Sequence, residues 1–225
     1  MSVETLMSIM RALLLIVLSA AALAAQTPAI QTNGTASINV TPDQASLTAG
    51  VVTQGATAQE AGQQNATQTT AMLNALKTAL GVNGTVQTVG YSVSPRYNNA
   101  SPAAIVGYTA SNTVQVVTTN LAIIGSLIDT ANQAGANNIS GVSFGLQDPE
   151  PVMQQALGKA ARQALNHAAA IAAGMGAKTG AILSAQEGAT YSPVTVNGLG
   201  APTTPIQTGT VTVTATVTAN VQLLQ

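Results

Sequence analysis

The last segment of the chain, residues 210–223, alternates threonine and other polar residues with small apolar residues. Successive side chains of a β-strand point to opposite faces of a sheet, so this period of two predicts a strand with one buried and one solvated face. The apolar positions are Val211, Val213, Ala215, Val217, Ala219, Val221 and Leu223. A chain with such a strand needs a second layer that covers one face of its sheet.

Other alternating runs predict further strands. They cover residues 36–40, 45–51, 86–93, 108–116, 139–146 and 181–187. Helical spacing of apolar residues predicts three helices, which begin at Thr57, near Leu121 and at Asp148. Thr57 and Glu60 have the spacing of a capping box, in which each side chain satisfies a free backbone N–H. This mixture predicts an α+β fold with a largely antiparallel sheet and about three helices packed on one face.

The third predicted helix begins with good capping chemistry, because Asp148 suits the N-cap and the following proline suits the first turn. The residues predicted for its buried face are Met153, Leu157, Ala160, Ala164, Ala168 and Ile171. Alanines on that face let the helix lie close to the surface that it covers. A glycine at 174 or 176 is expected to end it.

Residues 1–24 have the order of a secretory signal peptide. Arg11 precedes an apolar run of about 13 residues that is too short to span a bilayer, and Ala22-Leu23-Ala24 supplies a small-x-small cleavage site. Residues 25–32 carry no periodicity and are expected to form a flexible lead-in, with residues 33–225 as a single domain. We therefore expect an exported protein, periplasmic or secreted and with outer-membrane association as an option, whose mature chain has no transmembrane segment.

The composition excludes several classes of function. The chain has no cysteine, which excludes disulfides, a cysteine nucleophile and thiolate metal sites. Its six basic and seven acidic residues form no Lys/Arg cluster, so binding of nucleic acid through phosphates is excluded. With a single histidine, we expect no metal site and no cofactor.

Residues 141–145, GVSFG, match the G-x-S-x-G pattern of a nucleophilic serine, and Asp148 and His167 follow Ser143 in the order of a hydrolase triad. However, Ser143 alternates with apolar neighbours as a residue within a strand does, whereas a nucleophile elbow needs a sharp turn into a helix. Asp148 is also expected to cap a helix. We therefore predict a protein without catalytic residues and keep a serine hydrolase that uses Ser143 and His167 as a less favoured alternative.

The best candidates for a contact surface are Arg96 and Tyr97. They lie in residues 95–102, PRYNNASP, which are predicted to form the tip of a long hairpin between two strands. The exposed edge of a strand is a second candidate, because it could pair with another subunit.

Several motifs together resemble the SIMPL domain family of bacterial periplasmic and envelope proteins. They are Tyr108-x-Ala110-x-Asn112, Leu127-Ile128-Asp129, Gly135-Ala136-Asn137, Ile139-x-Gly141-Val142-x-Phe144, the alanine-rich helix after Asp148 and the final PIQTGTVTVTATVTANVQL. The similarity runs over about residues 33–223. The third helix departs from the family pattern, because alanines and His167 replace some of the expected basic residues.

The resemblance implies an exported, non-catalytic protein that self-assembles, in a family with some members linked to oxidative or envelope stress. We therefore predict a structural or interaction module of the cell envelope, a homo-oligomer that could also bind another envelope protein. A monomeric periplasmic protein that binds a ligand or stress factor is the alternative.

Overall fold

The computed structural model describes residues 27–196 and 209–225, which group into two compact units. The first unit contains residues 27–34, 160–187 and 217–225, and the second contains residues 35–159, 188–196 and 209–216. The predicted signal peptide, residues 1–24, lies outside the described residues. The single domain expected over residues 33–225 stays a prediction, since each unit draws on separate segments of that range.

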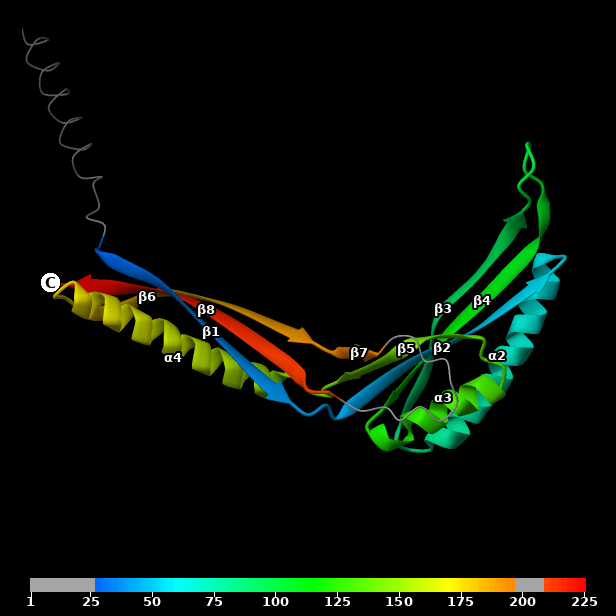
Figure 1. The fold of residues 1–225 in the computed structure, drawn as a ribbon, viewed down its shortest axis with the longest axis horizontal. Coiled ribbons are helices and arrows are strands. Elements are labelled where there is room, and N and C mark those ends of the chain that lie inside the picture. Colours follow the sequence, from blue (N-terminus) through cyan, green and yellow to red (C-terminus); the bar gives the residue numbers. More distant parts are fainter. Residues whose placement is uncertain (1–26, 197–208) are drawn as a thin grey trace, which may run out of the picture. The chain divides into compact units, whose positions relative to one another are not determined.

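A five-stranded sheet forms the second unit's main layer (Figure 1). Its strands, in spatial order, are β3 (Gly84–Tyr97), β4 (Ile105–Thr118), β2 (Gln44–Gly55), β5 (Asn138–Gly145) and β7 (Val194–Val196). All four pairings are antiparallel. The predicted α+β class and the antiparallel hairpin of β3 and β4 are therefore confirmed, although the strands divide between two sheets rather than one.

Helix α2 (Ala58–Leu80) and helix α3 (Ile124–Gln133) cover one face of this sheet, and the short 3₁₀ helix η1 (Leu121–Ile123) leads into α3 (Figure 1). Alternate residues of the central strand β2 face the helices, as the period of two predicts. The fully buried core side chains of the sheet and helices are Ala45, Leu47, Ala49, Val51, Met72, Leu76, Val114, Val116, Leu127, Ala131, Val142 and Phe144. The residues between them in β2, such as Ser46 and Thr48, are half-buried on the other face.

The predicted capping box at the start of α2 is confirmed. The Glu60 backbone N–H donates to Thr57 Oγ1 at 3.1 Å, and Glu60 Oε2 accepts from the Ala56 N–H at 3.0 Å. At the other end, Gly81 has a φ of 57°, a conformation that glycine adopts without steric cost.

Asn137, from the Gly135-Ala136-Asn137 motif, extends the pairing with the central strand β2 by one residue just before β5 begins. Its backbone N–H donates to Gly50 O at 3.0 Å. Its side-chain amide accepts from the Val52 N–H at 2.8 Å and donates to Val52 O at 2.7 Å. The side chain thereby takes the place of a neighbouring strand's backbone, which explains structurally why an asparagine stands at this position.

A three-stranded sheet has the order β1 (Ala29–Val40), β8 (Val211–Leu224) and β6 (Lys178–Ser192), and helix α4 spans Glu150–Gly174. The strictly alternating segment at the end of the chain is thus a strand, with Val211, Val213, Ala215, Val217, Ala219 and Val221 buried. Leu223, also predicted for that face, is half-buried.

In the first unit, α4 packs against β1 and β8 through alanines. Thr32 Oγ1 donates to Ala164 O at 2.8 Å, and Ala164 and Ala168 pack with Ala219 and Val221. The burial of Ala160, Ala164 and Ala168 confirms three positions of the predicted face of α4.

Several predictions of element boundaries or faces are wrong in detail. The flexible lead-in over residues 25–32 is wrong from residue 29, because β1 starts there and buries Ile30 and Thr32. Ile171 is 44% exposed, and Ala172 takes the buried position. The loop predicted over residues 191–205 is partly strand, with residues 191–192 in β6 and Val194–Val196 as β7, while residues 197–208 lie outside the described part.

Candidate functional site

Ser143 lies inside a regular strand. In β5 it stands opposite Ser46 of β2 on one side and Thr195 of β7 on the other. Helix α4 begins only at Glu150, so the serine is not on a sharp turn from strand to helix. The geometry of a nucleophile elbow is therefore missing at this position.

A shallow hollow of about 270 Å³ surrounds Ser143 on the face of the sheet opposite the core. Its lining residues are Ser46, Thr48, Ser140, Gly141, Val142, Ser143 and Thr195. The five serines and threonines among them offer neutral hydroxyls, and none of the seven residues is a histidine, carboxylate or amine that could take a proton from Ser143. The hollow as described supports neither nucleophilic nor acid–base chemistry.

The other two members of the suggested triad have local structural roles. Asp148 Oδ1 accepts from the Glu150 N–H at 3.0 Å, so its carboxylate caps α4 as predicted. His167 is exposed on α4, with Nδ1 3.0 Å from Asn33 O of β1. His167 belongs to the first unit, whereas Ser143 and Asp148 belong to the second.

Arg96 and Tyr97 lie at the end of β3 and not in the turn where the sequence placed them. Arg96 stands opposite Gly107 and Tyr97 opposite Ile105 in the β3–β4 pairing. Pro95 suggested a turn, but a proline is tolerated in an edge strand, where its missing N–H breaks no ladder bond. Arg96 Nη1 donates to Gln54 Oε1 of β2, and the side chain of Tyr97 is 57% exposed.

Strand β3 itself is an exposed edge. Among the strands of residues 27–196 and 209–225, β3 has only β4 as a neighbour, and almost all of its residues are exposed. Val89 and Tyr91 are 52% and 59% exposed, although both are large and apolar or aromatic. The strand therefore presents backbone hydrogen-bonding groups and apolar surface together.

A groove of about 370 Å³ lies in the first unit between α4 and β6. It is lined by Leu165, Asn166, Ala169, Thr179, Gly180, Ile182 and Val221. Sequence reasoning missed this groove, because it predicted one apolar stripe on α4. Leu165 lies outside that stripe. This second apolar position on α4 was the sequence signal that could have indicated a further contact surface on the helix.

Neither a metal centre nor a spanning helix was found in residues 27–196 and 209–225. These residues contain no group of three or more His, Cys, Asp or Glu side chains arranged to hold a metal ion. None of the helices described there is long and apolar enough to cross a membrane.

The described units define a class of α+β protein in which helices cover antiparallel sheets and the exposed features are strand edges and a groove. The chain belongs to the SIMPL family, described as a protein of unknown function (DUF541), whose family model matches residues 30–221. The resemblance identified from the sequence motifs is therefore confirmed.

Bacterial proteins match about 70% of this chain. The "26 kDa periplasmic immunogenic protein" of Brucella melitensis is 28% identical over 164 residues, which cover 70% of this chain and 66% of that protein. The "Uncharacterized protein YggE" of Escherichia coli K12 is 30% identical over 161 residues, which cover 70% of this chain and 64% of that protein. The match thus spans just under two thirds of these relatives, whose names state no enzymatic reaction.

Proposed function

We propose that this protein is exported to the periplasm and acts there as a non-catalytic interaction module that self-assembles through the edge of β3. A periplasmic location is supported by the signal-like order of residues 1–24 and by the name of the Brucella relatives. A role in oxidative or envelope stress, a second envelope protein as partner and association with the outer membrane remain predictions.

The uncharged edge of β3 is the observation that carries this proposal. The outer backbone groups of an edge strand can pair with a strand of another subunit, and charged side chains, lysine above all, usually prevent this. Residues 84–95 contain no charged side chain. A β-bulge between Thr88 and Gly90 and the proline at 95 interrupt the edge, so that two short regular segments are available on either side of the bulge.

Apolar surface beside this edge adds a reason for pairing. Tyr91 stands opposite Asn112, in the row of β4 that faces α2, and its hydroxyl lies close to Gly62 of that helix. A second subunit on the edge of β3 would cover Tyr91 and Val89, and burial of apolar surface contributes about 25 cal/mol per Å².

We expect the Val89→Lys variant to associate at least about tenfold more weakly than the parent protein, because pairing would bring two ammonium groups together in a desolvated interface. Size-exclusion chromatography with light scattering on residues 25–225 measures the mass against concentration. The parent chain should elute at a multiple of the monomer mass and the variant at the monomer mass.

Val82→Lys is the matched control, because Val82 is 99% exposed in the turn before β3 and the same change there should leave the mass unaltered. A Val89→Lys protein that kept the parent's mass would place the contact elsewhere. A parent chain that was monomeric at all concentrations would remove self-assembly and favour the monomeric binding protein.

We expect Ser143 not to react with a fluorophosphonate probe, because the hollow around it offers no general base. After incubation with the probe, the protein is digested, and mass spectrometry shows whether Ser143 carries the label. An active serine hydrolase treated in the same way is the positive control. Stoichiometric labelling of Ser143 that was lost in the His167→Ala variant would establish the hydrolase alternative instead.

A further inference from the structure

The far end of the β3–β4 hairpin extends past the neighbouring elements of the second unit. Strand β2 pairs with β4 only as far as Gly55, which stands opposite Tyr108, and helix α2 begins at Ala58. Figure 1 shows the hairpin continuing beyond both. We call residues 96–106 the hairpin end, and all of them are exposed. This surface is therefore a projection and not a groove.

Three large side chains of the hairpin end carry apolar surface into the solvent. Tyr97 is 57% exposed, Ile105 51% and Val106 54%. Tyr97 and Ile105 stand directly opposite each other and therefore share one face of the hairpin, while Val106 lies at an irregularity of the register. A tyrosine suits the boundary between water and lipid, because its ring is apolar and its hydroxyl is polar. Transfer of these side chains to an apolar phase would be favourable.

The turn between these side chains satisfies part of its backbone from within. The Asn98 N–H donates to Ala104 O at 2.9 Å, and Asn98 Oδ1 accepts from the Ala104 N–H at 2.8 Å and from the Ala100 N–H at 3.4 Å. An apolar phase offers no hydrogen bonds, so groups that are already paired enter it at a lower cost. Residues 97–106 also contain no charged side chain. The hairpin end is thus able to leave water without losing these hydrogen bonds.

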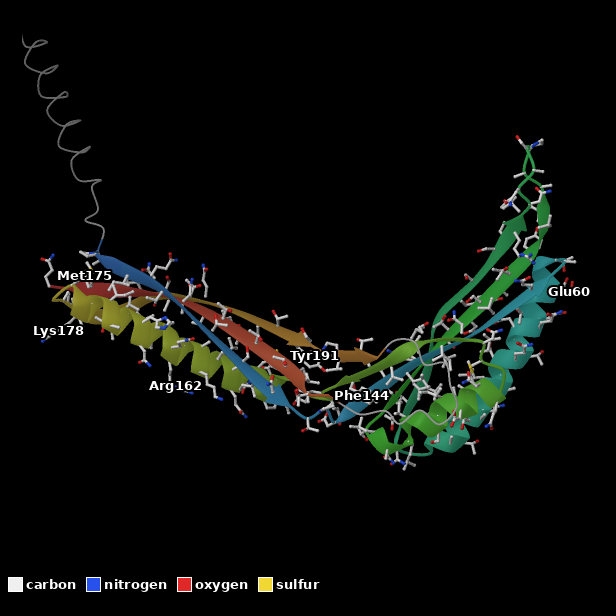
Figure 2. The ribbon with its side chains drawn as sticks, in the orientation of Figure 1. Glu60, Phe144, Arg162, Met175, Lys178 and Tyr191 are labelled. Atoms are coloured by element: carbon white, nitrogen blue, oxygen red, sulfur yellow. The ribbon has the colours of Figure 1, made fainter. Side chains whose placement is uncertain are left out.

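One cation stands at the base of the hairpin end. Arg96 is the only charged residue in residues 78–128. Its guanidinium donates to Gln54 Oε1, and among the described residues no carboxylate pairs with it. Figure 2 shows Glu60 at the start of α2, short of the hairpin end, and its carboxylate is engaged in the capping box. Since a guanidinium has five N–H donors, Arg96 keeps donors for an external anion.

From this combination we propose that the hairpin end inserts into the surface of a bilayer that contains anionic phospholipid. Tyr97, Ile105 and Val106 enter the boundary between headgroups and acyl chains, to the depth of about 5–10 Å that is usual for interfacial anchors. Arg96, one position nearer the sheet than Tyr97, then lies at the level of the headgroups and binds a lipid phosphate.

A lipid surface fits this projection better than a protein partner does. A stable protein interface covers about 800 Å² on each side with close shape complementarity, so a partner would need a cavity that matches the projection. A fluid bilayer adapts to a convex apolar end, and its negative surface potential attracts a cation. The hairpin end lies outside residues 84–95, which the proposed self-assembly uses. The proposal rests on the proposed export, because an exported chain meets the lipid surfaces of the envelope.

The fluorescence of a single tryptophan tests this assignment, because the chain has no tryptophan of its own. In residues 25–225 with Tyr97→Trp, vesicles of phosphatidylglycerol and phosphatidylcholine should shift the emission to shorter wavelength. Lipids brominated on their acyl chains should quench the emission. Val82→Trp is the control, since Val82 is 99% exposed in the turn at the opposite end of β3, and its emission should not change.

Two further substitutions separate the apolar and the charged contributions, both measured by co-sedimentation with vesicles. Ile105→Gln should weaken binding about fivefold, because it places a polar side chain among the acyl chains. Ile182→Gln is the matched control, because Ile182 is a similarly exposed isoleucine (57%) in a strand of the first unit, and it should leave binding unchanged. Arg96→Gln should weaken binding to vesicles with phosphatidylglycerol about fivefold and leave binding to pure phosphatidylcholine unchanged, since only the anionic headgroups attract the guanidinium.

The substituted positions are all exposed, and unchanged circular dichroism and melting temperature establish that the variants fold. The proposal is overturned if no vesicle shifts or quenches the Tyr97→Trp emission, or if Ile105→Gln binds as the parent does. Equal binding to vesicles with and without phosphatidylglycerol overturns the role of Arg96. A lower molar mass of Ile105→Gln with no effect of vesicles overturns the proposal in favour of a contact between copies of the chain.

Self-assembly and export are decided separately from these outcomes. The mass of the Val89→Lys variant without lipid decides the first, and the N-terminal residue of the chain recovered from cells decides the second.

Discussion

Replacement of Phe144 by alanine should lower the free energy of unfolding by about 4 kcal/mol, the largest effect that we expect from a single truncation in the core. Phe144 is the only phenylalanine of the chain and is fully buried. Its partners across the sheet are Ala45 and Val194, which are too small to fill the space that the ring would leave. Urea unfolding followed by far-ultraviolet circular dichroism measures the change.

Phe144→Leu is the matched variant, because it keeps an apolar side chain and removes only part of the volume. We expect it to cost about 1.5 kcal/mol. A loss of less than about 1 kcal/mol for Phe144→Ala would show that the sheet and helices of the second unit can collapse around the missing ring. In that case the core of this unit does not depend on one large side chain among many small ones.

Much of the fold could be predicted because local chemistry and tertiary structure agree. Thr57 and Glu60 have the pattern of a helix cap in the sequence and cap α2 in the structure. In β8, the apolar residues that alternate with threonine in the sequence are the residues that are buried in the structure. Predictions failed where close packing, and not local pattern, decides the outcome. Ile171 is larger and more apolar than Ala172, yet the alanine is buried, because α4 approaches its sheet through small side chains.

The candidate site was predictable only in part. Arg96 and Tyr97 were correctly placed in the β3–β4 hairpin, but the sequence did not indicate that β3 continues past Pro95. A proline is compatible both with a turn and with an edge strand, so Pro95 does not distinguish the two. The groove at Ile182 was not predictable from one helix or one strand. It arises because a single helix covers two of three strands, which is a property of the sheet order.

Replacement of Gly34 by alanine should lower the free energy of unfolding by about 3 kcal/mol, although it adds one methyl group. A Cβ on Gly34 would lie 2.0 Å from Ala160 O and 2.6 Å from Ala164 N, both of which belong to the backbone of α4. A flexible side chain could move away, but helix backbone can yield only if α4 lifts from β1. The hydrogen bond from Thr32 Oγ1 to Ala164 O would then be lost as well.

Hydrogen exchange followed by mass spectrometry shows which part of the chain is destabilised, whereas urea unfolding reports only the stability of the whole protein. In Gly34→Ala we expect amides of α4 after residue 160 to lose protection while those of α2 keep theirs, because Gly34 and that part of α4 belong to the same unit. Gly188→Ala is the control. Apart from the chain neighbours of Gly188, no atom of the described residues lies within 4 Å of a Cβ placed there, so its stability should match or slightly exceed the parent's. Equal protection of α4 in both variants would mean that its close approach to β1 is not what fixes the helix on its sheet.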